Sequence, residues 1–147
     1  MKMIVAAVDR SKPSLRAADF AAELAQKYDA ELILLSVVRD VEARDPGLEA
    51  YAHMEGLREP VPSLAIDALH GSLAPVRDKA IATGARRVST DVRIGEAADE
   101  ILACLTDQAA DLLVIGSRGH GRLAGLLLGS VVQRIAGVAP CPVLVVH

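Results

Sequence analysis

Glycine and serine residues near the carboxyl end of this chain have the spacing of a phosphate-binding turn. Gly116 directly follows the run Leu112–Ile115, which is short and apolar, as a buried strand is. Gly119 and Gly121 come next, and the pair Gly129–Ser130 follows after a spacer. Because glycine has no Cβ and adopts backbone conformations that other residues avoid, a ligand can approach such a main chain closely.

The charged side chains around this turn are all positive. No Asp or Glu follows Asp111, whereas Arg118 and Arg122 lie in the turn itself. A helix N-terminus carries unsatisfied N–H groups and about half a positive charge, so it attracts anions. Ser130 has the residue type of an N-cap or first-turn position, and its hydroxyl could serve a phosphate. His120, with the two arginines, could add charge-assisted contacts, so we predict that this segment binds a phosphate.

Composition excludes several classes of function. The chain has 147 residues, 52 % of them hydrophobic, which is enough for one domain spanning residues 1–147. A net charge of −3 and an aromatic content of 2 % argue against nucleic-acid binding, which needs cationic surface or stacking rings. Cys104 and Cys141 are isolated, and no apolar run reaches transmembrane length. We therefore expect a cytoplasmic protein with no membrane contact.

Short apolar runs alternate with segments of helical periodicity. We expect strands at residues 3–8, 31–38, 87–94, 112–115 and 142–146, with the third near an edge of the sheet, and helices at 11–28, 63–83, 95–109 and 129–138. Residues 39–62 read as a long connection with at most a short helix near 48–57, and Pro75 could kink the second helix. One face of the first helix carries Leu15, Ala18, Ala22, Ala25 and Tyr28, and the predicted core positions of the second helix are Ile66, Leu69, Leu73, Val76 and Ile81.

This alternation predicts an α/β fold, a single open five-stranded parallel sheet with helices on both faces. In such Rossmann-like sheets, ligands bind beyond the carboxyl ends of the strands, where the winding reverses. Asp9 and Gly116 follow the first and fourth strands and are therefore the first candidates for a site. The P-loop needs a Gly-Lys pair that this chain lacks, and the glycines after Gly116 come too late in the chain for a dinucleotide fingerprint.

The remaining pattern, Gly116-x2-Gly119-x9-Gly129-Ser130, resembles the signature of the universal stress protein family, in its ATP-binding branch. The resemblance extends over nearly the whole chain, from Ile4–Asp9 through Leu34–Val38 to Pro140–Val146. It implies an adenine nucleotide alpha hydrolase-like fold and a nucleotide-dependent regulator or sensor in the stress response. It also implies a homodimer formed through the last strand, Val143–Val146.

The same resemblance implies roles for individual residues. Asp9 would face a ribose hydroxyl, and Val37 would contact adenine through its backbone, with Val8 beside it. The glycines of the turn would let backbone groups reach the ribose and phosphates. The segment that starts the last helix would present N–H groups and one hydroxyl to the phosphates, and its residues are Gly129, Ser130, Val131 and Val132. The expected ligand is ATP, with ADP and AMP as alternatives and Mg²⁺ as an open question.

Other functions stay open at this point. In a homodimeric interaction module that works without nucleotide, the glycines would only form a turn, Ser130 would only cap its helix, and Asp9 would only cap the helix near Pro13. A third class is an enzyme of a related fold, similar to ATP pyrophosphatases or electron-transfer flavoproteins, although the Ser-Gly-Gly-x-Asp-Ser motif of the former is missing. No catalytic triad can be read from the spacing, so we expect slow ATP hydrolysis at most.

Overall fold

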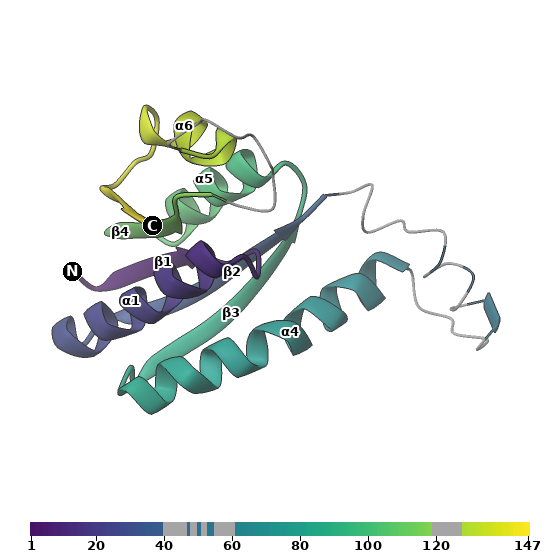
Figure 1. The fold of residues 1–147 in the computed structure, drawn as a ribbon, viewed down its shortest axis with the longest axis horizontal. Coiled ribbons are helices and arrows are strands. Elements are labelled where there is room, and N and C mark those ends of the chain that lie inside the picture. Colours follow the sequence, from purple (N-terminus) through teal and green to yellow (C-terminus); the bar gives the residue numbers. More distant parts are fainter. Residues whose placement is uncertain (40–46, 48–49, 51–52, 55–60, 119–127) are drawn as a thin grey trace.

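Five parallel strands form the sheet, in the order β3-β2-β1-β4-β5 (Figure 1). The computed structural model describes residues 1–39, 47, 50, 53–54, 61–118 and 128–147. The strands are β1 (Met3–Ala7), β2 (Glu31–Val38), β3 (Arg87–Ile94), β4 (Leu112–Gly116) and β5 (Val143–Val146). The helices between them are α1 (Lys12–Tyr28), α4 (Val61–Thr83), α5 (Ala97–Asp107) and α6 (Ser130–Ala136). The predicted strands are confirmed to within a residue at each end.

Helices cover both faces of the sheet, which confirms the predicted fold class. Alternate side chains of a strand point to opposite faces, so Ile4 and Ala6 of β1 pack with α1 and α4, while Val5 and Ala7 pack with α5 and α6. Figure 1 shows the two pairs of helices on opposite sides of the strands. The connections from β1 to β2 and from β2 to β3 run through α1 and α4 on one face of the sheet. The connections from β3 to β4 and from β4 to β5 run through α5 and α6 on the other face. The winding therefore reverses between β1 and β4.

Small side chains bring α1 close to the sheet. Ser11 is its N-cap and accepts a hydrogen bond from the Ser14 amide (3.3 Å), and a proline occupies the first turn, as predicted. The buried stripe of the helix is Ser14, Ala17, Ala18, Ala21, Ala22 and Ala25. Leu15 and Tyr28, which the sequence spacing groups on one face with the alanines, are instead 37 % and 50 % exposed. The alanines, rather than the larger apolar residues, face the sheet.

Helix α4 begins two residues earlier than predicted and runs through Pro75 without interruption. Leu73 is buried as predicted, and Ala80 is buried beside it. Ile81, predicted to lie in the core, is 50 % exposed because the buried stripe passes through its neighbour Ala80. Gly84 ends the helix with φ +109, a conformation that favours glycine. Within the described residues, no helix is both long and apolar enough to cross a bilayer.

Candidate functional site

The ends of β1 and β4 lie side by side at the point where the winding reverses. Ala7 is paired with Ile115, the last residue pair between the two strands. Beyond them, the Ser11 hydroxyl donates a hydrogen bond to the carbonyl of Arg118 (3.3 Å), which joins the loop after β1 to the loop after β4. The Gly129 amide donates to the carbonyl of Ser117 (2.8 Å) and fixes the start of α6 at the same edge. Three segments distant in sequence thus meet at one place.

Asp9 organises the turn between β1 and α1. Its Oδ1 accepts a hydrogen bond from the Ser11 amide (2.9 Å), and its own amide donates to the Ser14 hydroxyl (3.2 Å). Between them, Arg10 has φ +66. Ser11, not Asp9, is the N-cap of α1. The alternative that Asp9 caps this helix is therefore wrong, and Asp9 instead shapes the turn just before it.

Val37 lies on a part of β2 that extends past the end of β1. The last bond between these strands runs from the Val8 amide to the carbonyl of Leu35 (2.8 Å), and the register stops with Ala7 opposite Leu35. Backbone groups of successive strand residues point to alternate neighbours, and the Val38 carbonyl accepts from Gly95 on the β3 side (2.9 Å). The N–H and C=O of Val37 therefore point to the β1 side, beyond the end of β1. This strand edge offers one donor and one acceptor to a ligand.

Gly116 has a packing role that the sequence did not reveal. A Cβ built on this residue would lie 2.7 Å from the Pro13 carbonyl carbon and 2.7 Å from the Ser14 amide nitrogen. The missing side chain therefore lets the first turn of α1 close against the end of β4. The sequence predicts that the missing Cβ of Gly116 leaves room for the close approach of a ligand. In the structure, the first turn of α1 lies where that Cβ would be.

The start of α6 presents backbone donors at this edge. Gly129 is the N-cap and Ser130 the first helical residue, so the N-cap alternative for Ser130 is wrong and the first-turn alternative is confirmed. The Gln133 amide makes the first intrahelical hydrogen bond, to the carbonyl of Gly129 (3.0 Å). The amides of residues 130–132 therefore have no acceptor within the helix. Val132 is 2 % exposed, so it can offer a ligand only its backbone.

The remaining predicted site residues divide into two groups. Val8, the residue before Asp9, is buried, and Arg118 is exposed in the loop after β4. Gly119, His120, Gly121 and Arg122 lie outside the described residues, and so does most of the predicted short helix near 48–57. Among the described residues, no three His, Cys, Asp or Glu side chains are grouped in a way that could hold a metal ion.

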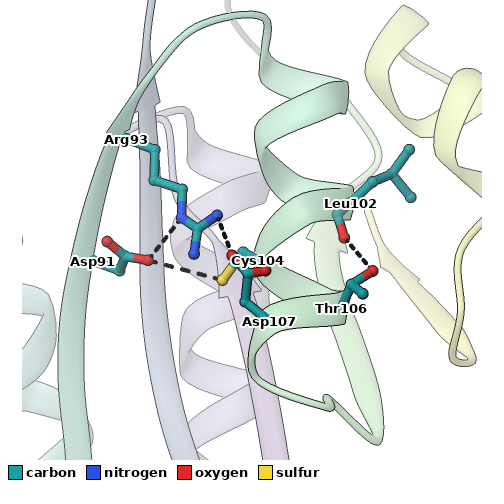
Figure 2. Close-up of polar contacts among 6 residues, drawn as sticks. All are labelled: Asp91, Arg93, Leu102, Cys104, Thr106 and Asp107. Carbon is teal, nitrogen blue, oxygen red and sulfur yellow. Dashed lines mark hydrogen bonds and ion pairs between the residues drawn. The ribbon is translucent and has the colours of Figure 1, made fainter.

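A second polar cluster, which the sequence did not indicate, joins β3 to α5 (Figure 2). Arg93 Nε binds Asp91 Oδ2 (2.9 Å), and Arg93 Nη1 binds Asp107 Oδ2 (3.1 Å). Burial lowers the pKa of Arg93, but the bonds to Asp91 and Asp107 outweigh it and raise the pKa. Finding this cluster needs the packing of α5, since Asp107 is far along the chain from Asp91. It ties the edge strand to the helix.

Cys104 lies against the same cluster, with its Sγ 3.9 Å from Asp91 Oδ2. Burial raises the pKa of the Cys104 thiol to about 11, although Arg93 lowers it in part. A thiol with that pKa stays protonated at neutral pH, and the thiolate is the nucleophilic form. Cys104 is fully buried and belongs to the core between the sheet and α5.

A shallow depression of about 220 Å³ lies at the opposite edge of the sheet, lined by Glu31, Arg87, Val88 and Ser89. These residues begin β2 and β3, at the amino ends of the strands. Arg87 there already pairs with Asp29 (3.7 Å) and Glu31 (3.6 Å). In an open parallel sheet, ligands bind at the carboxyl ends, so this depression does not compete with the site at the ends of β1 and β4.

Proteins of the universal stress protein family are similar to this chain over nearly its whole length. Residues 1–147 match the model of the universal stress protein family. A universal stress protein of Methanocaldococcus jannaschii, MJ0531, is 37 % identical over 145 residues, covering 99 % of this chain and 81 % of that protein. Among solved structures, the universal stress protein UspA of Lactobacillus plantarum has a TM-score of 0.80 at 24 % identity, with 99 % and 97 % of the two chains covered. A universal stress protein solved in complex with cAMP has a TM-score of 0.69 at 29 % identity, with 99 % and 96 % covered.

Proposed function

This chain belongs to the universal stress protein family, and from that premise we propose that it binds an adenine nucleotide and acts as a nucleotide-dependent regulator or sensor in the stress response. The binding place is the edge formed by the ends of β1, β2 and β4 and the start of α6, which we call the switch-point site. Its described residues are Val8, Asp9, Val37, Gly116, Arg118, Gly129, Ser130, Val131 and Val132. The preferred ligand is ATP, with ADP and AMP as alternatives.

The backbone edge at Val37 is the observation that carries the proposal. Adenine presents its N6 amino donor beside ring-nitrogen acceptors, and a strand residue with both backbone groups available can pair with such an edge. The N–H and C=O of Val37 point past the end of β1, where a planar base could continue the sheet by one step. That a relative was solved with cAMP supports the adenine part of the ligand.

The ribose and phosphates would extend from Val37 toward the loops after β1 and β4. Asp9 lies directly between, and the Ser11–Arg118 bond holds the two loops together there. The amides of residues 130–132 and the Ser130 hydroxyl would then receive phosphate oxygens, because donors ahead of a helical ladder attract anions. Mg²⁺, where present, would arrive with the phosphates.

Binding, rather than chemistry, is the role that these residues support. Among its described residues the site offers one carboxylate, Asp9, whose Oδ1 accepts the Ser11 amide. Phosphoryl transfer needs an oriented nucleophile and held metal ions. A ligand that binds only the folded state stabilises it by RT ln(1 + [L]/Kd), about 2.7 kcal/mol at a hundredfold excess over Kd. The occupied and empty forms would thus differ in stability, as a sensor requires, with slow hydrolysis at most.

Nucleotide content tests this proposal directly. We expect mass spectrometry of the supernatant from freshly purified, denatured protein to detect ATP or ADP. Added ATP should raise the unfolding midpoint by about 5 to 10 °C when it is a hundredfold above Kd, and GTP should raise it less. Protein that releases no nucleotide and shows no shift with ATP, ADP or AMP would contradict the proposal.

A homodimer through β5 is a second candidate, favoured by the position of that strand. β5 lies at an edge of the sheet and pairs with β4 alone. The carbonyl of Val146 accepts from Ser117 on the β4 side (2.7 Å), so by alternation the backbone groups of Val143 and Val145 point outward. Unpaired edges of this kind invite pairing with another strand.

Light scattering tests the dimer and separates it from the nucleotide site. The expected mass is twice the 15.4 kDa of one chain, with or without ATP. Val145→Pro removes an outward N–H and should give monomers, because it spares the ladder with β4. A wild-type protein that stays monomeric at high concentration would rule out the dimer, and a mass that changes with ATP would contradict its independence from nucleotide.

A further inference from the structure

Three cations lie close in the chain to residues of the switch-point site and have no acidic partner among the described residues. Arg10 and Lys12 belong to the turn before α1 and its first residue, and Arg118 belongs to the loop after β4. All three are exposed, and none forms an ion pair within the described residues. Elsewhere among the described residues, some cations pair with Asp or Glu, namely Arg77, Lys79, Arg87, Arg93 and Arg134, and others form no ion pair, namely Lys2, Arg16, Lys27, Arg39 and Arg86. The switch-point site therefore has positive charge to offer a ligand.

Arg10 also has an unusual backbone. Three described residues other than glycine have positive φ, namely Arg10 (+66), Asp29 (+49) and Ala109 (+47). Asp29 is the C-cap of α1 and Ala109 comes two residues after α5, places where the left-handed conformation commonly ends a helix. Arg10 precedes its helix, so helix termination does not explain it. Glycine would adopt this φ without the steric cost of a Cβ.

The turn itself imposes this conformation. Asp9 bonds to the Ser11 amide and to the Ser14 hydroxyl, and Ser11 bonds to the Arg118 carbonyl, so the residues on both sides of Arg10 are fixed. Residues held in such conformations gather at functional sites, where the side chain or the turn is used. A long cationic side chain at a position that favours glycine suggests that the guanidinium has a use.

We propose that Arg10 binds the outer phosphates of the nucleotide, so that affinity rises from adenosine to ATP largely through this residue. The inference rests on the proposed function and names the residue that would distinguish ATP from adenosine. Arg10 lies between Asp9, proposed to face the ribose, and the Ser11–Arg118 contact that joins the phosphate-side loop. A guanidinium binds phosphate oxygens in a bidentate, charge-assisted manner, and such bonds are about twice as strong as neutral ones. Adenosine lacks the group that Arg10 would recognise.

Calorimetric titration of wild type and Arg10→Gly with adenosine, AMP and ATP tests this inference. Arg10→Gly should weaken ATP binding by about tenfold or more and leave adenosine binding unchanged. Its unfolding midpoint without nucleotide should equal or exceed that of wild type, because glycine relieves the backbone at φ +66. Arg10→Lys keeps the charge and should retain part of the ATP preference. Arg86→Gln removes one charge beside the amino end of β3 and should change nothing.

Each outcome decides one point. Wild-type binding of adenosine and ATP, with Arg10→Gly equal to wild type for both, overturns the role of Arg10 and leaves the proposed function intact. An equal loss for adenosine and ATP also overturns it, because the turn and not the phosphate contact would then matter. A wild-type protein that binds neither ligand overturns the proposed function, and the inference with it.

Discussion

Gly116→Ala is expected to lower the unfolding midpoint of the ligand-free protein by about 2 to 12 °C. The new Cβ would lie 2.7 Å from two backbone atoms of the first turn of α1, and backbone cannot move aside as a flexible side chain can. Forcing an extra carbon into a packed contact costs about 1 to 3 kcal/mol, and each kcal/mol shifts the midpoint of a domain this size by roughly 2 to 4 °C. Thermal unfolding followed by circular dichroism measures the change.

Gly137→Ala is the matched control for this variant. A Cβ at Gly137, the C-cap of α6, meets nothing within 4 Å, and φ there is −90. We therefore expect a midpoint within a degree or two of wild type, since alanine fits this conformation. Equal midpoints for the two variants would show that α1 can withdraw from β4, contrary to the close packing described above. Because Gly116→Ala disturbs the packing of α1 on β4, a loss of ligand binding in this variant would not identify a ligand contact.

Val37→Pro is expected to weaken adenine nucleotide binding by tenfold or more while the protein remains folded. Proline removes the N–H that points past the end of β1 and places its ring where the base would pair. One lost hydrogen bond accounts for about 0.5 to 1.5 kcal/mol, and the steric block adds to it. Proline is tolerated where a strand N–H faces away from a neighbouring strand. Titration calorimetry with ATP and adenosine, beside a thermal scan, measures both effects.

Val38→Pro provides the opposite pattern. Val38 is paired with Ile94, and its backbone groups face β3, so proline there breaks the ladder. We expect a clear loss of stability, larger than that of Val37→Pro. If Val37→Pro binds ATP as wild type does, the base is not held by this strand edge. If both variants are equally unstable, the backbone of Val37 is part of the sheet after all.

Much of the fold could be predicted because the strands carry their own signal. The runs at residues 32–35 and 112–115 are uniformly apolar, which is typical of parallel strands buried on both faces, and the more polar run at 87–94 does form an edge strand. Leu15, Tyr28 and Ile81 are more exposed than the sequence spacing indicates, for one reason. The rotation of a helix about its axis is set by which small side chains fit the sheet, and hydrophobic spacing alone does not reveal that choice.

The sequence predicted a site at the ends of the first and fourth strands, but the physical role of several of its residues depends on register. Val37 was singled out by a family resemblance, and its available backbone edge follows only once Ala7 is known to pair with Leu35. Gly116 was expected to face a ligand, and its actual neighbour became visible only with α1 packed against β4. The Arg93–Asp107 pair depends on the packing of α5 and has no signal in the sequence.

Amide chemical shifts of ¹⁵N-labelled protein titrated with ATP test the central claim most directly, because they report where the nucleotide binds. The account predicts that the largest changes fall on Asp9, Val37, Arg118 and Ser130, at the carboxyl ends of β1, β2 and β4 and the start of α6. Ser89, at the opposite edge of the sheet, should stay unchanged. Shifts centred on Ser89 and Arg87, or none at saturating ATP, would contradict it.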